Sequence, residues 1–213
     1  TTSQIESMET VDIAALSIAS LKAFSTAKIQ ALRTDQVFAI GTDQAFGLTT
    51  ANVQALSSDQ LVAIHVPVLT SYNVQALTTA QISALLTSQV PALSAEQAYG
   101  TTTAQLRALI TAQVEVLNTD YIRALSTNQV VAFGTAQIEA LTTGQAFALS
   151  TRNITALSTQ QVVAFETRDI DALVSDNIRI LSTDQLAALG TAQIEALSTG
   201  QVASLSTRNI TAF

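Results

Sequence analysis

The sequence predicts an all-α fold, a solenoid of very short helices with one helix in each eight-residue repeat. Two observations lead to this prediction. A large apolar residue closes a unit every eight residues, and Thr, Gln and Ile or Val hold fixed places within each unit. Self-similarity at a fixed period is the sequence signature of repeat architectures. Neighbouring units of such a chain must stack to bury a continuous core.

The closing apolar residue defines the register along the whole chain. It recurs every eight residues from Leu16 to Ile64 and, after one shortened unit at 65–69, from Leu69 to Phe213, with Thr101 as the exception. No linker, charge run or change of composition interrupts the array. We therefore expect a single octapeptide-repeat domain over residues 1–213.

The consensus octad is Leu-(Ser/Thr)-Thr-x-Gln-(Ile/Val)-x-Ala, and residues 191–197 are a clean example of it. The spacing of three between Ile194 and Leu197 suits one face of a helix. We expect Thr191 to cap this helix, residues 192–197 to form it and Ser198 to begin the turn. Ordering eight residues costs about 8–16 kcal/mol, whereas burying two apolar side chains returns about 3–6 kcal/mol, so stacking must supply the stability.

The Gln of each octad falls inside the apolar arc of the helix. We therefore expect Gln193 to be buried and to bond backbone groups of an adjacent turn, since an amide both donates and accepts. Asn can take this place, as at Asn52, Asn73, Asn153, Asn177 and Asn209. Glu195 and Arg123 should project outward.

Three further patterns refine this interpretation. Gly in the turn position suggests positive φ after a helix, as at Gly41, Gly134 and Gly190. Where Ala replaces Ile or Val, the next residue is aromatic (Ala45–Phe46, Ala98–Tyr99, Ala146–Phe147), which suggests that the aromatic ring refills the core. A local alternation with a period of sixteen residues suggests that two octads form one structural step.

The alternative fold is a β-solenoid, because Thr, Val, Ile and Gln are common in strands. Against it, strict two-residue alternation is absent, and the Ile and Leu of one octad would point to opposite faces of a strand. Ala and Leu favour helix.

Composition excludes several functional classes. The chain has no Cys, which excludes a disulfide scaffold, a thiolate metal site and a Cys nucleophile. It has a single His, which excludes a His-rich metal centre. A net charge of −7 argues against nucleic acid as a partner. No apolar run approaches the length needed to cross a membrane, so we expect no membrane insertion.

No residue stands out from the repeat as catalytic, cofactor-binding or metal-ligating, and we expect no enzyme activity and no cofactor. We interpret His65 as a turn residue of the shortened octad beside Pro67. The scattered acidic residues suit the first turn of a helix (Asp35, Asp43, Asp59, Asp120, Asp176, Asp184). The glycosylation patterns at Asn153 and Asn209 fall on the inward-facing Gln position, and the regular Thr is explained as a cap rather than as an ice-binding array.

The segment 77–85, Leu-Thr-Thr-Ala-Gln-Ile-Ser-Ala-Leu, resembles octapeptide-repeat tracts of very large secreted or surface proteins of Gram-negative bacteria, often described as adhesin-like or RTX-like. The resemblance extends over nearly the whole chain. It implies an extracellular, cell-surface location and a spacer, adhesive or assembly role, and it transfers no catalytic residue.

Two functions are open. The first is a structural rod, acting as a filament subunit or an adhesin spacer, whose partner is itself or other segments of a larger surface protein. The second is a solenoid binding module for a peptide, glycan or surface ligand, with the variable position as its specificity surface (Phe38, Phe46, Val62, Tyr99, Val131, Phe147, Val163). Because Thr1 is not an initiator Met, we expect a processed product or an excerpt.

Overall fold

Every α-helix of the computed structural model, which describes residues 1–64 and 69–211, is four to six residues long. Among these residues there are 25 α-helices and no strand, which confirms the all-α solenoid and leaves no place for the β-solenoid alternative. The chain groups into two units, unit 1 (Thr1–Leu109) and unit 2 (Ile110–Phe213). The single domain expected over residues 1–213 stays a prediction.

Unit 1 contains α1 (Thr2–Ser7), α2 (Thr10–Ala15), α3 (Ile18–Lys22), α4 (Thr26–Gln30), α5 (Thr34–Phe38), α6 (Thr42–Phe46), α7 (Thr50–Ala55), α8 (Ser58–Ala63), α9 (Ser71–Ala76), α10 (Thr79–Ala84), the 3-10 helix η2 (Val90–Ala92), α11 (Ala95–Gly100) and α12 (Thr103–Ala108). Unit 2 contains α13 (Thr111–Glu115), α14 (Thr119–Ala124), α15 (Thr127–Val130), α16 (Thr135–Glu139), α17 (Thr143–Ala148), α18 (Thr151–Ala156), α19 (Thr159–Val163), α20 (Thr167–Ala172), α21 (Ser175–Arg179), α22 (Thr183–Ala187), α23 (Thr191–Glu195), α24 (Thr199–Ser204) and α25 (Thr207–Ile210).

The cap of each helix lies one residue earlier than the sequence predicts. In α10 the N-cap is Thr78, whose hydroxyl accepts from the backbone N–H of Gln81 at 3.1 Å, and Thr79 is already helical. Thr191 is likewise the first helical residue of α23, and its N-cap is Gly190. In octads such as that of α10 the predicted cap was wrong because two cap-forming residues are adjacent, and only the first, Thr78, has the extended backbone that a cap needs.

The glycine interpretation was also wrong. Gly41, Gly134 and Gly190 are N-caps with φ between −71° and −73°. No residue in the described ranges has positive φ. Extended residues make the connection between octads, so no left-handed residue is needed.

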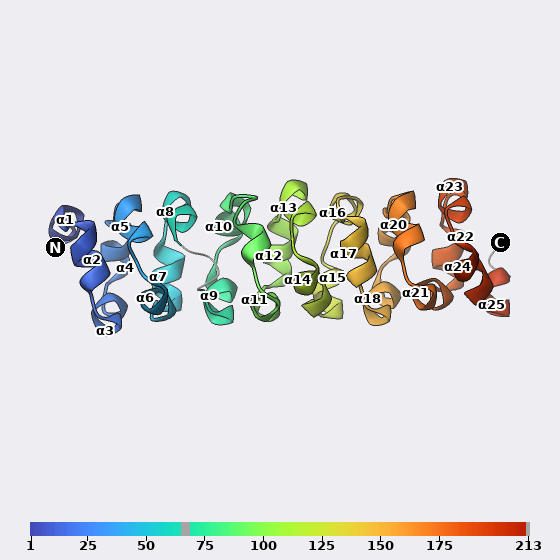
Figure 1. The fold of residues 1–213 in the computed structure, drawn as a ribbon, viewed down its shortest axis with the longest axis horizontal. Coiled ribbons are helices and arrows are strands. Elements are labelled where there is room, and N and C mark those ends of the chain that lie inside the picture. Colours follow the sequence, from blue (N-terminus) through green and yellow to red (C-terminus); the bar gives the residue numbers. More distant parts are fainter. Residues whose placement is uncertain (65–68, 212–213) are drawn as a thin grey trace. The chain divides into compact units, whose positions relative to one another are not determined.

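Three octads, or 24 residues, make one turn of the solenoid. Within unit 1, α4 packs on α7 and α5 on α8; within unit 2, α14 packs on α17 and α17 on α20. Figure 1 shows α5, α8 and α10 following one another along one edge of unit 1. The two-octad step suggested by the local alternation is therefore wrong.

Two positions of each octad build the core, the Ile or Val at the fourth helical position and the closing Leu. In α7 these are Val53 and Leu56, with 0% and 4% of their surface exposed. Thr101 closes its octad while buried, because its hydroxyl donates to the carbonyl of Gln97 at 3.0 Å. Outward projection of Glu195 and Arg123 is confirmed, since both are exposed.

The aromatic residues do not refill the core. Phe46, Tyr99 and Phe147 are 56%, 72% and 57% exposed. They follow a buried residue by one position, which turns them about 100° around the helix. Beside Ala98 the core volume is filled by a closer approach of two helices instead. The backbone at Gly100 lies so close to Ser71 that a Cβ on Gly100 would overlap the Ser71 carbonyl.

Candidate functional site

The most regular polar feature is a ladder of buried amides that joins successive turns. Gln60, at the third helical position (N3) of α8, is 3% exposed. Its Nε2 donates to the carbonyls of Ile29 at 2.9 Å and Leu32 at 2.6 Å, one turn earlier. Its Oε1 accepts from the backbone N–H of Ser57 at 2.8 Å. One side chain thus caps its own helix and bonds the preceding turn, as the sequence predicted.

The same arrangement recurs in both units. Buried Gln side chains that bond carbonyls of the preceding turn include Gln36, Gln44, Gln81, Gln97, Gln105, Gln145, Gln161, Gln185, Gln193 and Gln201. The predicted Asn substitutions are confirmed at Asn52, Asn73, Asn153, Asn177 and Asn209. Being shorter, each Asn reaches one carbonyl, as Asn153 reaches that of Leu125 at 3.3 Å.

The spacing of the ladder changes around the shortened octad. Gln60 bonds the carbonyl of Leu32, 28 residues earlier, whereas Gln81 bonds that of Leu56, 25 residues earlier. At Gln105, which bonds the carbonyl of Leu77, the separation is again 28 residues. One turn therefore absorbs the three missing residues, and the register of the next turn is normal.

A few octads place something other than Gln or Asn at N3. In unit 1 they include Asp12 of α2 and Ser20 of α3, both exposed, and Lys28 of α4, which is half-buried. In unit 2 they include Tyr121 of α14, which is buried, and Asp169 of α20, whose side chain is fully buried. An ionised Asp has no hydrogen to donate, so Asp12 and Asp169 cannot supply the donor that the ladder uses elsewhere.

The remaining candidates from the sequence do not come together as a reactive site. His65 lies outside the described residues. The six acidic residues singled out above occupy the first turns of their helices, as predicted, and are exposed. A hydrogen bond from Arg33 holds the pKa of Asp35 below its ordinary value, with Arg33 Nε 3.0 Å from its Oδ1. Where the chain is described, no three His, Asp or Glu side chains gather as metal ligands.

The two glycosylation patterns belong to the ladder. Asn153 and Asn209 are 2% and 1% exposed, and the amide of each donates to a backbone carbonyl. Neither side chain is accessible in the folded chain, in agreement with the inward orientation predicted for them.

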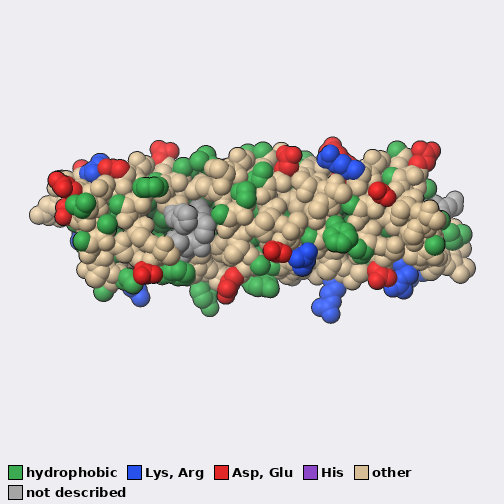
Figure 2. All heavy atoms as spheres, in the orientation of Figure 1, with side chains coloured by type: hydrophobic (Ala, Val, Ile, Leu, Met, Phe, Trp, Pro, Cys, Tyr) green, Lys and Arg blue, Asp and Glu red, His purple; other side chains and the backbone are tan. Residues whose placement is uncertain are grey.

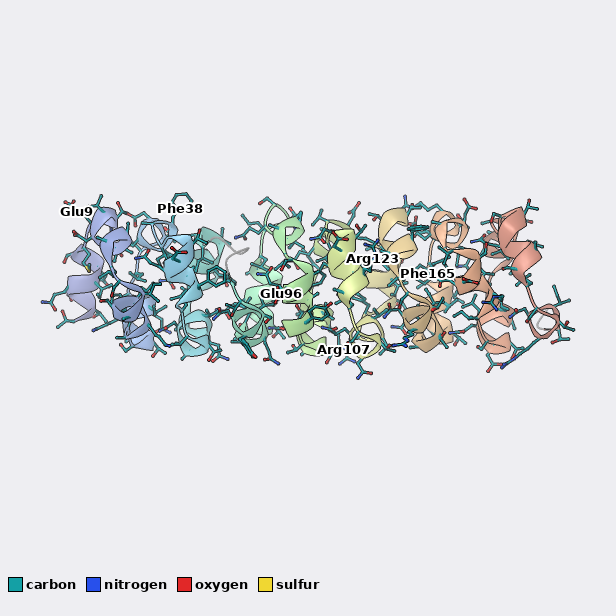
Figure 3. The ribbon with its side chains drawn as sticks, turned by 60° about the horizontal axis from the view of Figure 1, so that its bottom comes forward. Glu9, Phe38, Glu96, Arg107, Arg123 and Phe165 are labelled. Carbon is teal, nitrogen blue, oxygen red and sulfur yellow. The ribbon has the colours of Figure 1, made fainter. Side chains whose placement is uncertain are left out.

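The variable position faces solvent. Phe38 is 78% exposed and points away from the ribbon in Figure 3. Val62 and Val131 are half-buried, and Val163 is 41% exposed. A hollow of about 490 Å³ lies beside Phe38 and Val62 in unit 1. On the face drawn in Figure 2, charged and apolar side chains are scattered rather than gathered.

Among the described residues no helix has the length and apolar character needed to span a membrane. No curated protein is similar to this chain. A protein family described as the ALTTAQ repeat matches residues 5–42, 121–151, 162–199 and 170–207, which together cover more than half of the sequence. The hexapeptide Ala-Leu-Thr-Thr-Ala-Gln itself stands at residues 76–81. The chain is thus a repeat-based structural or binding protein and belongs to the ALTTAQ repeat family.

Proposed function

We propose that the chain is a structural spacer, a repeat array that sets the separation between other parts of a larger cell-surface protein. The observation that carries this proposal is the amide ladder. Each turn offers the next turn both an apolar layer and a row of carbonyl acceptors, so the array can be lengthened turn by turn without a new core. A spacer needs this property, and an enzyme does not.

The proposal includes a location outside the cell and no catalytic role. The resemblance to surface-protein tracts supports the location. The scattered charges and the engagement of the regular polar side chains in the ladder support a non-catalytic role. Labelling of intact cells with an antibody against the chain tests the location, because a cytoplasmic protein would be labelled only after the cells are opened.

The surface of α1 to α3 is poor in ladder amides, which supports a spacer over self-stacking on this surface. If a turn of another copy stacked on α1 to α3, amides at N3 of these helices would be the groups that bond its carbonyls. Asp12 instead accepts from the N–H of Glu9 at 3.1 Å, and the hydroxyl of Ser20 lies 2.8 Å from that of Ser17. Of the three, Gln4 alone carries an amide, so a stacked copy would leave carbonyls unbonded.

Sedimentation velocity over a wide range of concentrations tests this preference. We expect the unmodified chain to stay monomeric, and the double variant Asp12→Gln, Ser20→Gln to associate because it gains two donor amides. The matched control, Asp43→Gln with Ser83→Gln, changes the same residue types at exposed positions outside the ladder and should behave like the unmodified chain. Filaments of the unmodified chain in electron micrographs would overturn the spacer proposal in favour of self-assembly.

The exposed aromatic residues support a second candidate function, a binding module. Phe38 and Tyr99 are among the most exposed large apolar side chains, and exposed aromatic rings are common anchors of interfaces. Screening the labelled chain against glycan and peptide arrays tests this function. A genuine ligand should be lost in Phe38→Ala or Tyr99→Ala, whereas a signal unchanged in both variants would exclude these side chains as the binding surface.

A further inference from the structure

Asp169 occupies a ladder position that requires a hydrogen-bond donor. It stands at N3 of α20, where neighbouring octads of unit 2 carry Gln161 and Asn177. Its side chain is 0% exposed, and neither carboxyl oxygen has a hydrogen-bond partner. A buried polar group without a partner costs stability and requires an explanation.

Protonation would restore the missing donor. A neutral carboxyl group has nearly the shape of the Asn amide and carries one O–H. The amide of Asn177 donates to the carbonyl of Leu149, 28 residues earlier, at 3.2 Å. The equivalent carbonyl for Asp169 is that of Leu141, which closes the octad before α17. The ionised form offers this carbonyl only negative charge.

We propose that Asp169 is a proton-controlled latch between α17 and α20: the neutral carboxyl group closes the ladder at this turn, and the ionised group loosens it. The device is independent of the spacer proposal, because it concerns one turn of unit 2 whatever the array does.

The surroundings of the carboxyl group favour its neutral form. Arg168 Nε lies 3.8 Å from Asp169 Oδ1 but 2.7 Å from Glu166 Oε2, so the nearest positive charge is already paired in the exposed layer. Of the two helices packed against α20, α17 contributes the Thr143 hydroxyl and no titratable group, and the Glu195 side chain of α23 is exposed. Burial raises the pKa of Asp169 above its ordinary value, and this effect outweighs the opposing effects of the Arg168 charge and of the nearby Thr143 hydroxyl.

The direction of the pH dependence follows from this shift. An acid whose pKa is raised on folding binds its proton more tightly in the folded chain than in the unfolded chain. The latch is therefore fully closed below the ordinary aspartate value of about 3.9. It opens as the pH rises through the raised pKa.

Urea denaturation of the full chain at a series of pH values, with Asp169→Asn and the control Asp171→Asn, tests the latch. Asp171 is exposed on the same helix. The urea midpoint of the unmodified chain should fall, relative to that of Asp169→Asn, as the pH rises from 4 to 7. Asp171→Asn should follow the unmodified chain.

Hydrogen exchange supplies a local measurement. Protection of α17 and α20 amides should fall in the unmodified chain over the same pH interval, about tenfold for each unit by which folding raises the pKa. The Asp169→Asn variant should keep its protection. Equal pH dependence in the unmodified chain and Asp169→Asn, or a carboxyl ¹³C shift of Asp169 that titrates together with that of Asp171, would overturn the proposal.

Discussion

Replacing Gln145 with Leu should remove one complete rung of the ladder at nearly constant volume. Gln145 is 1% exposed, and its Nε2 lies 2.8 Å from the carbonyl oxygen of Val114 and 2.6 Å from that of Leu117. Its Oε1 accepts from the N–H of Thr142 at 2.7 Å. All of these residues lie in unit 2, and the variant leaves the core positions of the octad unchanged.

The expected loss follows from the groups that Leu leaves without their partner. The carbonyl of Leu117 and the N–H of Thr142 each lose the bond that Gln145 supplies. A buried backbone group without a partner costs about 1–3 kcal/mol, so the free energy of unfolding should fall by about 2–6 kcal/mol. Gln145→Asn should lose about 1 kcal/mol, because Asn keeps one carbonyl bond, as Asn153 does.

Urea denaturation followed by circular dichroism measures these differences, and hydrogen exchange shows whether the loss is centred on α17. The control is Gln160→Leu, an exposed Gln beside the ladder residue Gln161, which should change stability by less than about 0.5 kcal/mol. If Gln145→Leu and Gln160→Leu were equally stable, the amide ladder would not be what joins the turns.

Two further pairs of substitutions test the packing and the caps. Gly100→Ala should destabilise unit 1 by about 1–3 kcal/mol, because its Cβ would overlap the Ser71 carbonyl. Gly144→Ala, whose new Cβ would have its nearest neighbour at 3.6 Å, should stabilise unit 2 by about 0.4–1 kcal/mol. Thermal denaturation shows whether each variant is less or more stable than the unmodified chain. Thr78→Ala should lower the free energy of unfolding by about 1 kcal/mol, because it removes the N-cap of α10. Thr79→Ala should lower it by less than about 0.5 kcal/mol. If urea denaturation showed Thr79→Ala to be the less stable variant, Thr79 rather than Thr78 would be the N-cap.

The sequence was most informative at positions where a physical requirement restricts the residue type, as at the buried amide positions. Gln193 lies inside an apolar arc, and a buried amide must satisfy both its donor and its acceptor. This requirement predicted an inward side chain bonded to a neighbouring turn, and the Nε2 of Gln193 donates to the carbonyl of Phe165 at 2.7 Å. The helical period and the core positions followed equally well from spacing.

The sequence was least informative where two adjacent residues could serve as the N-cap, or where core volume could be filled in two ways. Adjacent cap formers such as Thr78 and Thr79 differ only in backbone conformation, which composition does not encode. The core volume lost at the small residue Ala98 can be filled either by the side chain of Tyr99 or by a closer approach of the neighbouring helix. The packing of Gly100 on Ser71 shows that the second solution is used. The turn of three octads depends on the angle between octads, which the pattern within one octad does not contain.

The direction of the ladder has a consequence for how the chain is made. The ladder bonds named above run from a later amide to an earlier carbonyl, as from Gln36 back to Ile5 and from Gln201 back to Ile170. A ribosome adds residues from the amino-terminal end, so each acceptor is synthesised before the donor that seals it. Every turn can therefore dock on a finished surface while the rest of the chain is still unmade, and synthesis and folding proceed in the same direction.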